Sequence, residues 1–212
     1  FVAHILTTRN PFLDPKLIAQ RLVGATDVSA SPTADWFRAL LAPADAPHGD
    51  DGRPYPFFLA HPLAAAVASL GDVRDWLVEW KYDGIRAQLV RRAGRVWLWS
   101  RGEELIGERF PEIVEAVAGL ADGTVLDGEI LVWDPGMEHP APFARLQTRI
   151  GRRNVTARIL REHPARFVAF DLIEHRGEDW RGRPQHQRRQ ALADMLGEGG
   201  GTLRCSPLVG AT

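Results

Sequence analysis

Short strand-like runs dominate the chain after its first third, and two of them carry the signature of a hairpin. Residues 76–82 lead into a run over 85–93, and Ala93-Gly94 then turns the chain back through residues 96–100. Two such runs joined by a short glycine-containing turn are typical of antiparallel strands. The pattern therefore predicts a domain built around a mixed, largely antiparallel sheet.

The apolar runs that follow alternate between strand and helix patterns. Residues 125–133 and 167–173 are predicted as two further strands. The apolar spacing over residues 110–120 predicts an amphipathic helix. A second helix is predicted over about residues 184–196, and the glycine-rich residues 197–201 end it.

The first forty residues predict helices instead of strands. Asp14-Pro15 and Ser31-Pro32 both have the pattern of a helix start, a capping residue followed by proline. Residues 43–56 are rich in proline, glycine and aspartate, which is typical of a linker. We therefore expect an α+β chain, with a small helical segment and its linker over residues 1–48 and the sheet domain over residues 49–212.

Lysine is rare in this chain, and Lys81 occupies a distinctive place. It is one of two lysines among 26 lysines and arginines, and it precedes Asp83-Gly84 at the predicted end of a strand. A guanidinium is effectively always protonated, whereas a lysine amine can lose its proton in a suitable site and act as a nucleophile. Taken alone, Lys81 is compatible with a Schiff-base former, a phosphate-binding charge, a covalent nucleophile or an ordinary surface lysine.

Two carboxylates lie in the middle of the predicted strand over residues 125–133. Because side chains alternate along a strand, Asp127 and Glu129 are expected on one face, with Leu126 and Ile130 on the other. Carboxylates on a sheet face need a cation, ligand hydroxyls or water as partners. An exposed sheet face and a binding site both satisfy that need.

Arginines provide two candidate anion sites. Arg101 follows the hairpin beside Gly102, a place suited to capture of a phosphate or carboxylate, although a surface salt bridge is the simpler interpretation. A basic stretch with Glu162 as its single acid is compatible with either a solvated face or a phosphate-facing one. Its arginines are Arg145, Arg149, Arg152, Arg153, Arg158, Arg161 and Arg166.

Composition limits which cellular compartment and which binding partners are expected. The chain has a net charge of −1, whereas proteins dedicated to nucleic-acid binding usually carry an excess of basic residues. The single cysteine, Cys205, cannot form an internal disulfide and fits a reducing compartment. No apolar run approaches the length of a membrane span, and we expect no signal peptide. We expect a cytoplasmic, monomeric protein without membrane association.

The segments discussed above, taken in order, resemble one enzyme family. Residues 81–86, Lys-Tyr-Asp-Gly-Ile-Arg, are similar to the KxDGxR signature of covalent nucleotidyltransferases, which capping enzymes and RNA ligases share. The motifs that follow have the order and rough spacing of those in ATP-dependent DNA ligases, particularly the bacterial kind. These motifs are Ser100-Arg101 to Glu104, Phe110-Pro111-Glu112, Leu126-Asp127-Gly128-Glu129, Leu146-Gln147-Thr148-Arg149 and Phe170-Asp171-Leu172.

The resemblance also carries an expectation about fold and completeness. It implies that residues 49–212 are the first part of an ATP-grasp-like nucleotidyltransferase (adenylation) domain. It implies that residues 1–48 are the end of a helical DNA-binding domain with its linker. The family's EGxV-like and KxKxxY-like motifs and its OB-fold domain do not occur before Thr212. We therefore expect this chain to be C-terminally incomplete and to self-adenylate poorly.

The resemblance assigns the chemistry to three basic residues. Lys81 would attack the α-phosphate of ATP, form a lysyl-adenylate and release pyrophosphate. Attack requires a neutral amine, which nearby positive charge or desolvation would favour. Arg86 and Arg101 would contact the ribose and phosphate side of the nucleotide, and Arg101 would later hold the 5′-phosphate of the nick.

Three further residues are assigned to the nucleoside and the metal. By resemblance, Glu79 would read the adenine amino group and Phe170 would stack on the adenine ring. Glu129 would bond the ribose or help to place a divalent ion. Mg²⁺ is the expected ion, because the charge on triphosphate and pyrophosphate must be neutralised during displacement.

The implied substrate is nicked duplex DNA, sealed in replication, repair or recombination. Arg101, Arg149, Arg152 and Arg153 are the candidate DNA contacts. An RNA ligase or a GTP-using capping-type enzyme would share the KxDG chemistry, and a non-catalytic DNA-binding module descended from a ligase is a further alternative. The motifs at residues 110–112 and 146–149 favour the DNA ligase.

Overall fold

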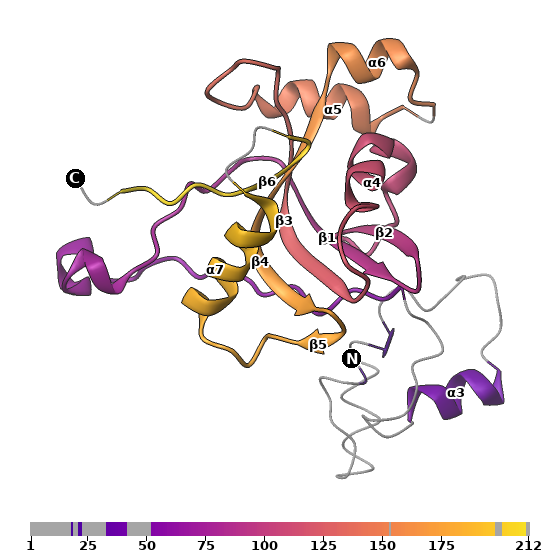
Figure 1. Cartoon of the computed structure of the whole chain (residues 1–212), viewed down its shortest axis with the longest axis horizontal. Helices are drawn as coiled ribbons and strands as arrows, with labels where there is room; N and C mark the ends of the chain where they lie inside the picture. Colours follow the sequence, from indigo (N-terminus) through magenta and orange to yellow (C-terminus); the bar gives the residue numbers. More distant parts are fainter. Residues whose placement is uncertain are drawn as a thin grey trace.

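The computed structural model describes Ile18, Arg21, Leu22 and residues 33–41, 52–152, 154–197 and 201–210. In this described part of the chain, six strands form one sheet in the order β2-β1-β3-β4-β5, and β6 pairs with β4 (Figure 1). Every ladder is antiparallel except the one between β4 and β6, which confirms the predicted mixed, mostly antiparallel sheet. The strands are β1 (Ile85–Arg92), β2 (Arg95–Ser100), β3 (Thr124–Val132), β4 (Ala165–His175), β5 (Glu178–Asp179) and β6 (Leu203–Cys205).

The β1–β2 hairpin forms where its sequence predicts it. Arg92 pairs with Arg95, so Ala93 and Gly94 are the two residues of the turn, with φ of 47° and 71°. A two-residue turn with positive φ at both positions matches the right-handed twist of the strands it joins. The turn therefore sets the register of the hairpin that carries both Arg86 and the chain leading to Arg101.

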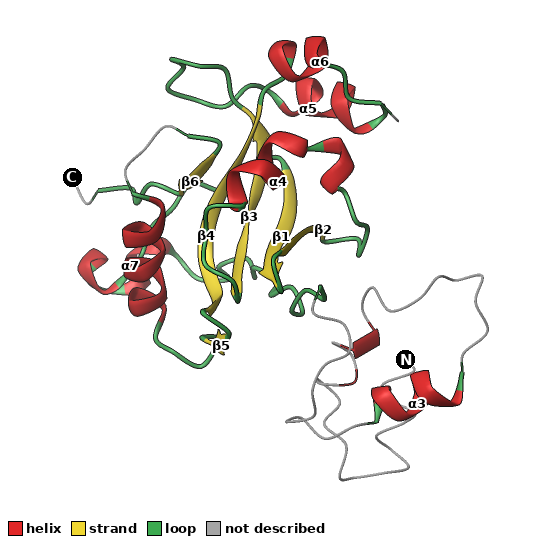
Figure 2. Ribbon diagram, turned by 45° about the vertical axis from the view of Figure 1, so that its right-hand side comes forward, coloured by secondary structure: helices red, strands yellow, loops and turns green. Residues whose placement is uncertain are grey.

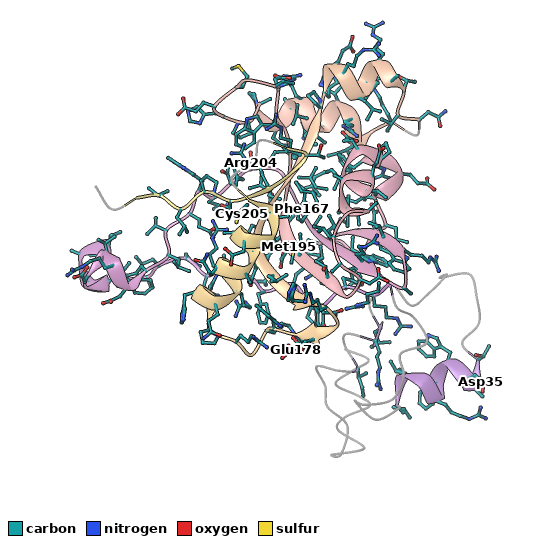
Figure 3. The ribbon with its side chains drawn as sticks, in the orientation of Figure 1. Asp35, Phe167, Glu178, Met195, Arg204 and Cys205 are labelled. Atoms are coloured by element: carbon teal, nitrogen blue, oxygen red, sulfur yellow. The ribbon has the colours of Figure 1, made fainter. Side chains whose placement is uncertain are left out.

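Helices cover one face of the sheet. The main apolar core joins Ile113 of α4, Leu146 of α5 and Leu192 of α7 to strand residues such as Leu126 and Phe167. Figure 2 shows α4 crossing the strands and α7 beside β4, and Figure 3 shows Phe167 close to Met195 and Cys205. The helices are α3 (Ala34–Leu40), α4 (Pro111–Val117), α5 (Phe143–Ile150), α6 (Ala157–Glu162) and α7 (Gln185–Leu196), with short 3-10 turns η1 (Val67–Leu70), η2 (Val73–Asp75) and η3 (Gly107–Arg109).

The opposite face of the sheet carries two small apolar clusters with polar side chains between them. One cluster contains Val90, Val125 and Ile173. The other contains Leu131 and Val168, together with Trp133 and the partly buried Tyr82. Strand alternation places Asp127 and Glu129 on this face, because their neighbours Leu126 and Ile130 belong to the core under the helices. The predicted sharing of one face by these two carboxylates is confirmed.

Residues 76–82 differ from their predicted strand. Within the described part of the chain they form no regular ladder, and their pairing is limited to a bridge between Glu79 and Leu208 and a hydrogen bond from Val209 N to Val78 O of 2.8 Å. The apolar side chains of this segment predicted a strand packed against the sheet, yet Trp76 is 50% exposed. A strand needs a neighbouring strand for its backbone hydrogen bonds, which a local pattern cannot supply.

Within residues 1–48, the structure describes Ile18, Arg21, Leu22 and residues 33–41. The start signals at Asp14-Pro15 and Ser31-Pro32 lie outside the described residues. Helix α3 is capped by Thr33, whose Oγ1 accepts from Trp36 N at 3.1 Å. Leu40 of this helix is buried, whereas Phe37 is 44% exposed. Among the described residues, no helix has both the length and the apolar character needed to cross a membrane.

Candidate active site

A pocket of about 770 Å³ opens between the two apolar clusters on the face of the sheet opposite the main core. Lys81, Arg86, Arg101, Glu129 and Phe170 all line it. Each comes from a different segment: the chain before β1, β1 itself, the end of β2, β3 and β4. The volume lies in the range of about 300–1,000 Å³ that is usual for sites of small molecules and cofactors. The fold thus brings together residues that lie up to 89 positions apart, from Lys81 to Phe170.

The segment that carries Lys81 is held against the middle of β3. Gly84 N donates to Oε1 of Glu129 at 3.1 Å. A Cβ at Gly84 would lie 2.3 Å from Ile130 O, so a side chain cannot be accommodated without movement of the backbone. The glycine of the KxDG pattern therefore permits close packing of this segment on β3, and the exposed Lys81 side chain reaches the pocket from it.

Glu129 has the most strongly shifted carboxyl group in the pocket. Its burial raises its pKa to about 7, while the hydrogen bond from Gly84 and the positive charges of Arg86 and Lys81 oppose the rise. Near neutral pH this carboxyl group is close to its midpoint of ionisation. A cation bound beside it would favour the ionised form.

Arg86 is fixed by contacts on three sides. Its Nε and Nη2 donate to the two oxygens of Asp127 at 3.2 and 3.0 Å, and its Nη1 donates to Phe58 O. Its guanidinium also lies 5.4 Å from the ring centroid of Phe170. Burial raises the pKa of Asp127, and the hydrogen bonds from Arg86 oppose that rise. The guanidinium of Arg86 is therefore the cation that pairs with Asp127, and this bidentate pair orients Arg86 toward the pocket.

Two residues that line the pocket, Asp171 and Arg188, were not among the predicted site residues. Asp171 follows Phe170 on β4 and accepts from Nε and Nη2 of Arg188, on α7, at 2.8 and 3.0 Å. Asp171 belongs to the quoted motif Phe170-Asp171-Leu172, so the motif was the available signal for it. No sequence pattern marked Arg188 as a site residue, because the helix over residues 184–196 was predicted from its apolar positions alone.

Glu79 was predicted to contact adenine, and the structure places it elsewhere. Among the described residues that line the pocket, Glu79 does not appear. Its Oε1 lies 3.5 Å from Nε of Arg189, and its backbone bridges to Leu208. Burial raises the pKa of Glu79, and the charge of Arg189 opposes that rise. Its contact with adenine stays a prediction that this geometry does not favour.

The predicted DNA contact of Arg149 is corrected by the structure. Its side chain is fully buried and paired with both carboxylate oxygens of Glu112, and it donates to the carbonyl oxygens of Arg109 and His163, each at 2.9 Å. The sequence pattern could not distinguish this buried ion pair from a surface arginine. Arg152 is exposed and donates to Thr148 O at 3.3 Å, while Arg153 lies outside the described residues.

Arg101 stands at the exposed side of the pocket. Its backbone N donates to Arg86 O at 3.0 Å, which sets the two arginines side by side at the ends of β1 and β2. In the part of the chain that the structure describes, no ion pair involves its guanidinium. No cluster of three or more His, Cys, Asp or Glu side chains suited to a metal ion occurs among the described residues either.

Comparison with known proteins identifies the family. The family model described as the ATP dependent DNA ligase domain matches residues 58–208. A probable DNA ligase of Koribacter versatilis is 37% identical over 147 residues, which are 69% of this chain and 25% of that protein. A probable DNA ligase of Opitutus terrae is 35% identical over 193 residues, 90% of this chain and 18% of that protein.

The solved structures that resemble the chain include mycobacterial DNA ligase D complexed with ATP and MES. It is 28% identical, has a TM-score of 0.48, and the alignment covers 63% of this chain and 40% of that one. The chain spans a quarter or less of the length of the two curated relatives named above. Since the family model matches well over half of the chain, this protein belongs to the family of ATP-dependent DNA ligase domains.

Proposed function

We propose that ATP binds in the 770 Å³ pocket and that Lys81 is adenylated there. The neutral amine of Lys81 attacks the α-phosphorus of ATP, and a nitrogen–phosphorus bond forms. The bond from that phosphorus to the bridging oxygen of the β-phosphate breaks, and pyrophosphate leaves with the electron pair. The nitrogen loses a proton to solvent, which leaves AMP joined to Lys81 as a phosphoramidate.

The observation that carries this proposal is the convergence of Lys81, Arg86, Arg101, Glu129 and Phe170 on one cavity. We assign Phe170 to stacking on adenine, because its ring lines the pocket. We assign Arg101 to the phosphates, because it is exposed and lines the pocket, where its guanidinium can pair with an anion. Arg86, already oriented by Asp127, is assigned to the ribose side of the nucleotide.

We propose Mg²⁺ as the accompanying ion, with Glu129 as its protein ligand. Mg²⁺ is usually held by one or two carboxylates together with substrate phosphates rather than by a complete protein cage. Glu129 fits that pattern, since it lines the pocket and the hydrogen bond from Gly84 N engages its Oε1. The ion would neutralise the charge on the triphosphate and on the departing pyrophosphate.

For the whole protein we propose sealing of nicks in duplex DNA. AMP would pass from Lys81 to the 5′-phosphate at the nick, and the adjacent 3′-hydroxyl would then displace AMP. We propose residues 49–212 as part of the adenylation domain and residues 1–48 as the end of a DNA-binding domain with its linker. Of the proposed DNA contacts, Arg101 and Arg152 lie among the described residues and are retained. We also propose that the protein is a cytoplasmic monomer.

Labelling with ATP that carries radioactive phosphorus at the α-position tests this proposal on the full-length protein. We expect Mg²⁺-dependent label on the wild-type protein and none on Lys81→Ala. The chain offers a matched control in its other lysine, so Lys16→Ala should keep the label. Label that persists in Lys81→Ala contradicts the assignment of the nucleophile. Label from GTP in preference to ATP would identify a capping-type enzyme instead.

A further inference from the structure

A register shift in β4 places two consecutive side chains in the pocket. Asp127 pairs with Asp171 and Gly128 pairs with Ala169, so Phe170 has no partner residue on β3. Before this point Ala169 faces the core under the helices, and after it Leu172 does. Alternation would put one of two neighbours on each face, yet both Phe170 and Asp171 line the pocket. Bulges of this kind redirect a side chain, and they are over-represented beside active sites.

Asp171 closes this bulge and ties it to α7. Its Oδ1 accepts from Leu172 N at 2.9 Å, and both of its carboxylate oxygens accept from the guanidinium of Arg188. Nη1 of Arg188 also donates to Arg183 O at 2.5 Å, which joins the pair to the turn before α7. The side chains of Arg188 and Asp171 are only 13% and 15% exposed. A two-bond contact shielded from water holds its geometry more firmly than a surface ion pair does.

A second arginine–aspartate pair lies beside Phe170. Arg86 is bound to Asp127, and its guanidinium lies 5.4 Å from the Phe170 ring centroid. Since Asp127 is the register partner of Asp171, the aspartates of the two pairs lie opposite each other on the adjacent strands β3 and β4. Arg86 contacts the ring directly, whereas Arg188 acts on it through the backbone of the bulge.

The geometry points to Arg188 and Asp171 as positioning residues that set the orientation of Phe170 for the purine ring. This inference rests on the proposed function. The Arg188–Asp171 pair fixes the backbone of the bulge, and the bulge orients the Phe170 ring toward the pocket. Adenine then stacks on this ring. The pair therefore determines the affinity for the nucleotide, and it leaves the displacement at phosphorus unchanged once ATP is bound.

The test compares ATP KM with the rate constant of lysine labelling at saturating ATP, both measured on the full-length protein. Arg188→Lys keeps the charge and loses the two-bond fork. Because stacking of a base on an aromatic ring contributes to affinity, we expect partial misplacement of the ring to raise KM about five- to tenfold, with a saturating rate within about twofold of wild type. Arg145→Lys is the matched control, since Arg145 forms the same kind of pair with Asp134 away from the pocket lining.

A double-mutant cycle separates positioning from a general structural role. In the background of Phe170→Leu, the effect of Arg188→Lys on KM should fall below about twofold, because the ring through which it acts is gone. An unchanged KM in Arg188→Lys, or the same rise in both backgrounds, overturns the inference and leaves the proposed function intact. Absence of label on the wild-type protein overturns both.

Asp171→Asn provides a second route if Arg188→Lys does not fold. It preserves the size of the side chain and an oxygen for Leu172 N, while it weakens the pair with Arg188. We expect the same rise in KM at an unchanged saturating rate. If neither variant folds while Arg145→Lys does, the pair is a requirement for folding rather than a positioning device, and the inference fails.

Discussion

The backbone N–H of Gly84 and the carboxylate of Glu129 are joined by a hydrogen bond of 3.1 Å that ties the lysine-bearing segment to the centre of β3. The same carboxylate lines the pocket, so one side chain both anchors the segment that carries Lys81 and faces the proposed ligand. The position of Lys81 is thus coupled to the state of Glu129.

Replacement of Gly84 by alanine should disturb both the fold and the placement of Lys81. The new Cβ would lie 2.3 Å from Ile130 O, and relief of that contact requires the segment to move off β3. We expect a loss of about 1–3 kcal/mol in the free energy of unfolding, together with slower labelling of Lys81. Urea unfolding measures the first effect. Gly119→Ala is the control, because nothing lies within 4 Å of the Cβ it would add.

The raised pKa of Glu129 predicts a pH dependence of stability. The folded pKa is about 7 and the ordinary value is 4.5, so between these values the folded state binds more protons than the unfolded state does. Stability contributed by this group is therefore present at low pH and is lost as pH rises from about 4.5 toward about 7.

Glu129→Gln removes this titration and supplies the measurement. The free energy of unfolding of wild type minus that of Glu129→Gln should be larger at pH 5 than at pH 8 in the absence of nucleotide and metal, where both pH values are chosen to bracket the transition at about 7. Subtraction cancels the titration of other groups. A difference that is flat across this range, or that grows with pH, would contradict the raised pKa.

Arg149 should matter for folding and not for DNA. Its guanidinium is fully buried against Glu112, so Arg149→Met leaves a carboxylate without its partner, and we expect a loss of about 3–5 kcal/mol in the free energy of unfolding. Arg152→Met, on the exposed end of the same stretch, should change stability by less than about 0.5 kcal/mol. Denaturant unfolding of the two variants decides the matter, and equal stabilities would refute the structural role of Arg149.

Phe167 and Phe170 lie three positions apart on β4 and should respond differently to the same substitution. Phe167 belongs to the core under the helices, so Phe167→Leu should lower the free energy of unfolding by about 1–2 kcal/mol and leave ATP affinity unchanged. Phe170 lines the pocket, so Phe170→Leu should weaken ATP binding by about 1–3 kcal/mol with little change in stability. Calorimetric titration with ATP, paired with thermal unfolding, measures both. An exchange of the two phenotypes would mean that the faces have been misassigned.

Local patterns in the chain predicted the parts of the fold whose causes are local. The β1–β2 hairpin was predictable because a two-residue turn with Ala93 and Gly94 sets both the reversal and the register. The common face of Asp127 and Glu129 was predictable because strand side chains alternate with a period of two. The residues assigned to the nucleotide were found from an ordered set of short motifs, and all but Glu79 line one pocket.

Features that depend on distant partners could not be read in the same way. Whether Arg149 faces water or Glu112 depends on how α5 packs against α4, and whether residues 76–82 form a strand depends on a neighbour to pair with. The bulge at Phe170 and its contact with Arg188 likewise arise from the register of β3 against β4 and from the position of α7. A periodic pattern states which side chains share a face, since that follows from backbone geometry within one element. Which groups meet across that face is settled by packing between elements, where the cost of burying an unpaired charge selects the partner.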